Sequence, residues 1–275
     1  VFPNLFIADY GARQNTPIYI RGIGSKTNAP SVGLYVDGMP YFERSVVDMD
    51  IAGISGIEVL RGPQGTLYGR NSTGGLINLY TYSPLDYQNT MAKISYGSRN
   101  DLRLGVNHYQ KISSCLGINV AANYHHNDGF FRNLYTGAKA DNLQSANTKV
   151  GLAWQVTPLW TMRLSALFDH STQGGYPYGH YHAADNTADA VNYNRPGYYR
   201  RNLFTAGMNW LYKGNAVHFN SQTSVQLSKD KQQIDQDFTP RDLFFTIMGL
   251  KQTLVSQEFA LRSAEDNSRY HWMVG

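Results

Sequence analysis

Residues 57–81 constrain the fold more than any other part of the chain. A β-rich run, 57–60, leads into Gly62-Pro63 and a glycine-rich loop, and the chain then continues as a second apolar run, 76–80. A Gly-Pro step ends a strand, and glycines allow positive φ or the close approach of two backbone segments. The pattern therefore predicts a compact folded loop between two strands, and it argues against a flexible linker.

The composition favours β structure without excluding a membrane. The 275 residues could form one large or two ordinary domains, and they include 20 Tyr, 12 Phe and 26 Gly. No stretch approaches the roughly 20 apolar residues that a membrane helix needs. A transmembrane barrel turns only alternate residues toward lipid, so the mean hydropathy of -0.41 is compatible with a membrane-spanning sheet.

Several functional classes receive no support. The net charge of +4 comes from scattered basic residues, so we expect no nucleic-acid binding. One cysteine, Cys115, excludes an internal disulfide and a cysteine-rich metal site. Residues 22–27 lack the Gly-Lys-Ser/Thr step of a phosphate loop. Asp169, His170 and Ser171 are strand neighbours that point to opposite faces and cannot form a relay. We expect no enzyme, no catalytic residue and no cofactor.

Apolar and polar residues alternate through the second part of the chain, in segments of about ten residues. These segments start near Leu102, Ile118, Val150, Met162, Phe204, Val217 and Val255. Short connections (157–159, 213–215, 265–268) alternate with long polar and aromatic ones (129–147, 171–199, 229–245). That asymmetry predicts antiparallel transmembrane β-barrel strands with short turns on one side. A soluble β-sandwich is the alternative, but its loops show no such alternation.

Three motifs, in this order, resemble the plug-domain signature of TonB-dependent outer-membrane receptors: residues 19–24, residues 32–40 and residues 57–81. The resemblance implies a plug domain of mixed α+β type with a small sheet, inside a barrel of about 22 strands. We place the plug at 1–85 and the first barrel strands at 86–275. The residues of this plug motif are Gly22, Asp37, Gly38, Glu58, Gly62, Pro63, Gly65, Tyr68, Gly69, Gly74 and Gly75.

Both ends of the chain look like cuts in a longer protein. Residue 1 is Val, no signal-peptide pattern follows it, and the last residues read as the interior of a strand. Members of the resembled family carry an energy-coupling segment before the plug. Residues 86–275 have room for about nine strands, so we expect this region not to close a barrel by itself.

The resemblance implies active import across the Gram-negative outer membrane, energised by the TonB complex through a segment not present here. The form of residues 60–69 is similar to the siderophore-receptor branch, so an iron chelate is the expected ligand. Importers of haem, cobalamin or oligosaccharide, and a signalling or binding receptor, are the alternatives. Outer-membrane lipid is the further expected partner.

Three charged residues are candidates for holding the plug in the barrel. Arg21 and Arg61 each precede a glycine and resemble plug arginines that pair with inward-facing barrel glutamates. The alternation around Val255 sends Glu258 inward, where a fork of hydrogen bonds with an arginine would be directional. The alternative is that both arginines bond plug carbonyls. Asp37 and Glu58 are interpreted as local structural residues.

The long connection after residue 171 supplies candidate ligand contacts. Its aromatic part suits stacking on a flat ligand, and its candidates are Tyr176, Tyr178, His180, Tyr181 and His182. Two histidines two residues apart are a weak metal signal, so no metal site is assigned. On the plug, Tyr10, Arg13 and Gln14 are candidate contacts at the outer end.

Overall fold

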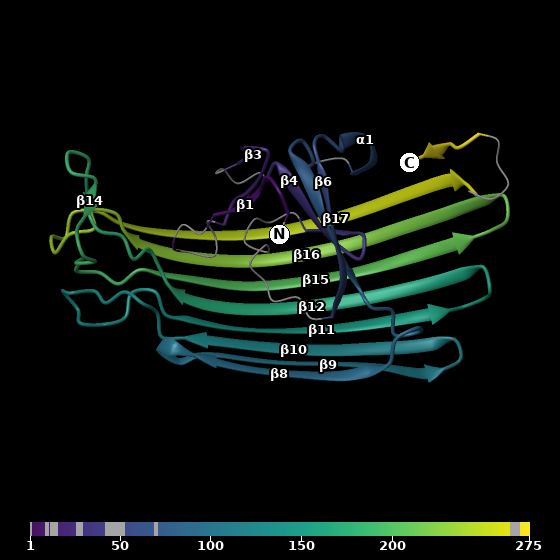
Figure 1. The fold of residues 1–275 in the computed structure, drawn as a ribbon, viewed down its shortest axis with the longest axis horizontal. Helices are drawn as coiled ribbons and strands as arrows, with labels where there is room; N and C mark the ends of the chain where they lie inside the picture. The colour runs from purple at the N-terminus through teal and green to yellow at the C-terminus, as the bar shows by residue number, and fades with distance from the viewer. Residues whose placement is uncertain are drawn as a thin grey trace.

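A computed structural model describes residues 2–8, 11, 16–25, 30–41, 53–68, 71–264 and 270–275 (Figure 1). The chain up to Thr81 forms small sheets that lie against one face of a large sheet, which starts at Asn89. The predicted boundary near residues 83–85 falls in the connection between these two parts. Among the helices in the described part of the chain, none is long and apolar enough to cross a membrane.

Two small sheets build the described portion of the plug part. One is antiparallel with the order β1 (Leu5–Ile7), β2 (Ile18–Ile20), β3 (Ile23–Gly24). The other has the order β5-β4-β7-β6, formed by β4 (Val32–Val36), β5 (Met39–Tyr41), β6 (Ile54–Arg61) and β7 (Gly75–Thr81). β4 runs parallel to β7, and the other pairs are antiparallel. Within the described plug residues the helical part is the single turn α1 (Gly65–Tyr68).

Two hairpins of the plug share one turn geometry. Arg21 and Gly22 join β2 to β3 with φ of 52° and 80°, and Asp37 and Gly38 join β4 to β5 with φ of 52° and 82°. Positive φ at both central residues is the type I′ pattern, which matches the twist of paired strands and favours glycine at the second position. The glycines of these two motifs are therefore turn residues.

The large sheet, called the wall below, is a nine-stranded antiparallel meander with each strand paired to its chain neighbour in the order β8 to β18. A separate two-stranded hairpin, β13 (Tyr181–His182) and β14 (Thr187–Ala188), lies within the connection from β12 to β15. The wall strands are β8 (Asn89–Gly97), β9 (Asp101–Ser113), β10 (Leu116–Asn127), β11 (Leu143–Gln155), β12 (Trp160–Gly174), β15 (Tyr198–Lys213), β16 (Val217–Asp235), β17 (Phe245–Ser263) and β18 (Met273–Val274).

The predicted alternation is confirmed by the two faces of the wall. One cross-strand row presents apolar side chains away from the plug: Val120, Val150, Ala166, Ala206, Val225 and Val255. Val150 and Val255 of this row are 48% and 70% exposed. The adjacent row, Ala121, Lys149, Leu167, Thr205 and Gln226, is buried against the plug. An apolar outer face with a polar inner face is the pattern of a membrane barrel.

Aromatic rings gather at the end of the wall that carries the short turns. The Trp160 ring lies 6.1 Å from Trp210, 4.9 Å from Tyr212 and 6.4 Å from Phe219, and Phe219 stacks on Phe259 at 6.3 Å. Bands of aromatic residues occupy the membrane–water interfaces of such barrels, because one part of each ring is apolar and another polar. An aromatic cluster at this end of the wall is therefore the pattern expected at a membrane–water interface.

The strands are longer than their hydropathy predicts. β11 begins at Leu143, β12 continues to Gly174 and β16 to Asp235, so part of each predicted long connection belongs to the wall. β8, an edge strand whose residues are all exposed, was not predicted. The ladder of backbone hydrogen bonds continues where side chains on both faces are polar, and there the alternation that signals a strand disappears.

The apolar core crosses the boundary between the plug and the wall. Leu167 of β12 and Leu203 of β15 pack into a buried cluster with plug residues from β2, β4, β5 and β7: Ile18, Ile20, Val32, Leu34, Val36, Tyr41 and Ile77. The plug is thus seated on the wall by shared burial of apolar surface, which contributes roughly 25 cal/mol per Å².

Candidate functional site

A charged pair joins the plug to the wall next to this core. Lys149 Nζ lies 3.2 Å from Asp37 Oδ2 and 3.3 Å from the Thr81 hydroxyl. The Asp37 carboxylate also accepts the Thr81 backbone N–H and hydroxyl, both at 2.7 Å. The side chains of Lys149 and Asp37 are only 7% and 22% exposed. The type I′ turn aims the carboxylate at the wall, and charge-assisted hydrogen bonds fix it there.

Further contacts on neighbouring strands hold the plug against the wall. The Ser165 hydroxyl donates to Met39 Sδ at 3.4 Å, and Met39 packs so closely on Gly207 that a Cβ at Gly207 would overlap its sulfur. On β9, the Tyr109 hydroxyl donates to the Gly53 carbonyl at 3.4 Å. The plug therefore contacts the wall from β9 to β16.

Sequence reasoning interpreted Asp37 as a local residue and missed Lys149. The carboxylate has the expected local partner, Thr81, and in addition a partner on the wall 112 residues away. The signal was present, because Val150 points outward and its neighbour Lys149 must then point inward. A lone inward lysine on a barrel strand could therefore have been flagged as a plug contact.

The structure does not bring the three predicted coupling residues into contact. Arg21 at the tip of its hairpin and Arg61 at the end of β6 are exposed. Glu258 lies on the plug-facing side of β17, opposite Gln222. Burial, followed by the nearby charge of Glu258, raises the pKa of plug Tyr35 to about 12. Within the described residues neither arginine forms an ion pair with Glu258, and that pairing stays a prediction.

The remaining motif residues brace the four-stranded plug sheet. The Glu58 carboxylate accepts the Asn78 amide and the Tyr80 hydroxyl, both at 2.9 Å, and the bond from Asn78 is the main reason that its pKa is lowered. Asn78 also donates to the Tyr68 hydroxyl at 3.3 Å. The Tyr35 hydroxyl donates to the Tyr68 carbonyl at 2.7 Å. These bonds connect β4, β6, β7 and α1.

The glycines of the motif permit close packing at the start of β7. Gly75 has φ of 137°, and a Cβ there would lie 2.4 Å from the Leu60 carbonyl oxygen. A Cβ at Gly74 would lie 3.0 Å from the Ile23 side chain. Gly62 has φ of 113° and precedes Pro63 at the end of β6, while Gly65 starts α1. Gly69 lies outside the described residues.

A second charged pair lies within the wall. The Arg201 guanidinium donates to Asp169 Oδ1 at 2.7 and 3.0 Å, and both residues are 0% exposed. Nearby, the Tyr199 hydroxyl donates to Asp230 at 3.0 Å. From the sequence, Asp169 was considered only as part of a relay, and Arg201 was not singled out. Their inward orientation follows from the alternation that turns Phe168 and Phe204 outward. Without its partner, either charge would be buried unpaired, which is costly.

The predicted ligand loop divides into a buried and an exposed part. Tyr176 is 3% exposed, its hydroxyl bonds to Gln232, and its N–H donates to the Gly11 carbonyl at 3.4 Å. This ring is enclosed in the structure, and its predicted contact with an external ligand stays a prediction. Tyr178 is 36% exposed and packs on Phe238 with ring centroids 5.5 Å apart.

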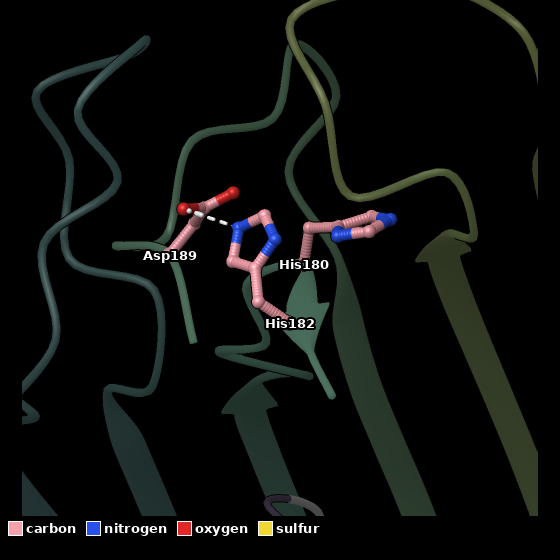
Figure 2. Close-up of side chains that lie close together, drawn as sticks. All are labelled: His180, His182 and Asp189. Atoms are coloured by element: carbon pink, nitrogen blue, oxygen red, sulfur yellow. Dashed lines mark hydrogen bonds and ion pairs between the residues drawn. The ribbon is translucent and has the colours of Figure 1, made fainter. Parts of the chain in front are cut away.

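The rest of this loop is exposed. His180, Tyr181 and His182 are exposed, and His182 Nε2 lies 3.0 Å from Asp189 Oδ1 (Figure 2). The structure therefore brings the two histidines together and adds Asp189, which sequence reasoning missed. The predicted plug contacts Tyr10, Arg13 and Gln14 lie outside the described residues.

Comparison with known proteins shows which proteins resemble this chain in sequence. Residues 2–76 match the family model of the TonB-dependent Receptor Plug Domain. Pesticin receptors of Yersinia enterocolitica and Yersinia pestis are each 40% identical over 86 residues, which cover 30% of this chain and 13% of the receptor. The chain therefore spans a small part of the length of these relatives.

Solved structures show the same fold over nearly the whole chain. The ferric yersiniabactin uptake receptor FyuA from Yersinia pestis superposes with a TM-score of 0.83 at 23% identity, covering 99% of this chain and 43% of FyuA. FpvA of P. aeruginosa, in a pyoverdine–iron complex, gives 0.73 at 16% identity, covering 98% and 37%. With its plug seated on an apolar-faced wall of antiparallel strands, the chain is thus similar to TonB-dependent receptors, in sequence over the plug and in fold over nearly its whole length.

Proposed function

We propose that the complete protein imports a ferric siderophore across the outer membrane with energy from the TonB complex. The observation that carries this proposal is the seating of the plug. One apolar cluster and a few polar contacts, chief among them the Asp37 and Lys149 pair, hold it against the wall. Such an attachment is firm at rest and can be broken without breaking either sheet.

The cargo assignment draws support from the relatives. FyuA is described as a ferric yersiniabactin uptake receptor, and FpvA is described with bound pyoverdine and iron. The siderophore-like form of residues 60–69 agrees with these descriptions. For this chain the cargo, the TonB partner and a whole barrel of about 22 strands are proposals, in which the nine-stranded wall would form one continuous part.

We place the external ligand contacts on the exposed part of the long connection. Tyr178 and Tyr181 offer ring surface to solvent, and Tyr178 lies beside plug residue Gly11, so a ligand there could touch the plug and the wall together. Tyr10, Arg13 and Gln14 would complete the site from the plug. Tyr176 has a different role in this proposal, since its hydrogen bonds fix the base of the loop.

Further plug contacts come from Arg21, Arg61 and Glu258 in this proposal. Its support is the position of Glu258, which faces the plug near Tyr35. Their exposed side chains would pair as the plug shifts, while the Asp37 and Lys149 pair holds the resting position.

Uptake measurements test the proposal. The complete gene is expressed in a Gram-negative host that lacks its own siderophore receptors, and uptake of 55Fe-labelled siderophores, haem, cobalamin and oligosaccharides is compared with and without the proton-motive force. We expect energy-dependent uptake of a ferric siderophore. Binding without uptake would instead indicate a signalling or binding receptor. Uptake of an oligosaccharide alone would refute the assignment of a ferric siderophore as the cargo.

The exposed tyrosines give a sharper version of this test. Stacking contributes about 0.5 to 1.5 kcal/mol per aromatic pair, so replacing Tyr178 and Tyr181 together with alanine should weaken siderophore binding about tenfold. Tyr135, exposed on the neighbouring loop, is the matched control, and Tyr135→Ala should leave the Kd unchanged. Equal Kd values for the double variant and the parent protein would show that these rings do not contact the siderophore.

A further inference from the structure

Three metal-ligating side chains meet on the β13–β14 hairpin. Tyr181 pairs with Ala188 and His182 with Thr187, which puts His180 and Asp189 next to each other at the open end, where the Asp189 N–H donates to the His180 carbonyl at 2.9 Å. His180 and His182 are two residues apart, so they share a face of the strand. One potential ligand atom from each of His180, His182 and Asp189 lies within 4.8 Å of the others (Figure 2).

The hairpin is held in shape by its own hydrogen bonds. The Asp185 carboxylate accepts the Thr187 N–H at 3.3 Å and the Thr187 hydroxyl at 2.8 Å, and the Tyr181 hydroxyl donates to Asn186 at 2.7 Å. These bonds close the turn and leave both histidine rings outside it. A ligand set mounted on a closed turn loses less conformational entropy on binding than one on an open loop.

The donor set selects a class of cation. Two imidazoles and a carboxylate suit Zn²⁺, Cu²⁺, Ni²⁺ and Fe²⁺, whereas Ca²⁺ and Mg²⁺ prefer oxygen ligands alone. His182 and Asp189 are already 3.0 Å apart, near the roughly 3.4 Å between donors in a tetrahedral site with bonds of about 2.1 Å. Figure 2 shows the His180 ring turned away from Asp189, and its centroid is 5.2 Å from that of His182. Rotation about the exposed His180 side chain brings its nitrogen into the set.

We propose that His180, His182 and Asp189 form a binding site for a divalent transition-metal cation, of the Zn²⁺ and Cu²⁺ class, on the outer loops of the receptor. This goes beyond siderophore import, because the site needs no chelate and lies on a hairpin of its own. All three side chains are exposed, so a cation reaches them directly from solution. The remaining coordination positions are open to water or to a ligand donor.

The alternative to a metal site is a simple hydrogen bond between His182 and Asp189. The chain contains a second histidine–aspartate pair that serves as a control for this alternative. His126 Nε2 lies 3.1 Å from Asp128 Oδ1, nearly the same distance as in the His182 and Asp189 pair, and both side chains are half-exposed. Within the described residues the His180, His182 and Asp189 group is the one set of three whose ligand atoms are this close. A metal site therefore predicts different behaviour for the two pairs.

Metal titration of the complete receptor tests the proposal. The protein is purified in detergent with a tag free of histidine, and Zn²⁺ binding is followed by calorimetry and Co²⁺ binding by visible absorption. We expect one strong site, whose Kd rises about tenfold or more in His180→Ala and in His182→Ala. Asp189→Asn should also weaken it, since a neutral amide is a poorer ligand than a carboxylate. His126→Ala should bind as the parent does.

Unchanged affinity in both histidine variants, or loss of the strong site in His126→Ala alone, would overturn the assignment. The substitutions are in an exposed hairpin, and heat-modified migration of each variant confirms that its barrel is intact. Ferric siderophore uptake measured on the same variants keeps the two proposals apart. Metal binding lost with uptake retained supports the metal site and leaves the import proposal standing.

Discussion

Lys149 on the inner face of β11 reaches Asp37 in the turn between β4 and β5, with 3.2 Å between Nζ and Oδ2. The two residues belong to different parts of the chain, and the Thr81 hydroxyl bonds to both. The contact therefore joins the wall, the plug turn and the last plug strand at one point, next to the apolar cluster that they share.

Lys149→Met should loosen the plug. The substitution keeps the length of the side chain and leaves Asp37 partly buried without its cation, at a cost of roughly 1 to 3 kcal/mol. We expect faster proteolysis of the plug in the folded receptor, measured by mass spectrometry of the released peptides. Lys93→Met, at an exposed position of β8, is the control and should change nothing. A coupling energy near zero in a cycle with Asp37→Asn would contradict the assigned contact.

Arg61→Ala should reduce plug retention and uptake more than siderophore binding. The side chains of Arg61 and Glu258 are exposed, so their coupling in a double-mutant cycle should not exceed about 1 kcal/mol. Arg241→Ala, in an exposed loop, serves as the control. If uptake and plug protection both stay at the parent level in Arg61→Ala, the proposed coupling role of Arg61 is wrong.

Arg201→Met should destabilise the wall far more than Arg200→Met, although the two arginines are neighbours. Removing the Arg201 guanidinium leaves Asp169 charged and fully buried, at a cost of about 3 to 5 kcal/mol. Arg200 points the other way and lies over the Tyr198 ring at 4.6 Å. Urea unfolding of the two variants in detergent gives the comparison, and similar midpoints would show that the buried pair does not stabilise the wall.

Acid should release the loop between β16 and β17 through Asp237. A hydrogen bond from the Thr239 hydroxyl, with N–H donors of the same loop, holds the pKa of Asp237 at about 2. Because the folded pKa lies below the ordinary value of 3.8, the stabilisation is complete above that value and disappears as the pH falls toward about 2.

Limited digestion checks this pH dependence. At neutral pH, trypsin should cut after Arg241 faster in Asp237→Asn than in the parent, while Asp185→Asn, on another hairpin, should not change that cut. With pepsin, the difference between Asp237→Asn and the parent should shrink from pH 4 to pH 2. A difference that is the same at both pH values would exclude this titration.

The wall could be predicted from the sequence because its signal is repeated. Alternation at Val120, Val150 and Val255 fixes which side chains face away from the plug, and so which residues of neighbouring strands share a face. Strand ends such as Gly174 and Asp235 could not be predicted, because both faces are polar there and only the backbone continues the ladder.

The site was predictable only in part. The plug glycines follow from turn chemistry, and Glu258 follows from alternation. The contact of Asp37 with Lys149 depends on how the plug sits against the wall, which no local pattern encodes. Asp189 joins the two histidines through a hairpin of two-residue strands, which is too short to leave a periodic signal. The burial of Tyr176 depends on a hydrogen bond to Gln232, a residue 56 positions away.

The plug contacts made by Lys149 and Leu167 lie opposite each other on two adjacent strands. This layout has a mechanical consequence. A pull along the strands would load these contacts together, as in shear, whereas a pull across the strands would open them one after another, as in peeling. The direction of an applied force, and not its size alone, would then decide how readily the plug leaves its seat.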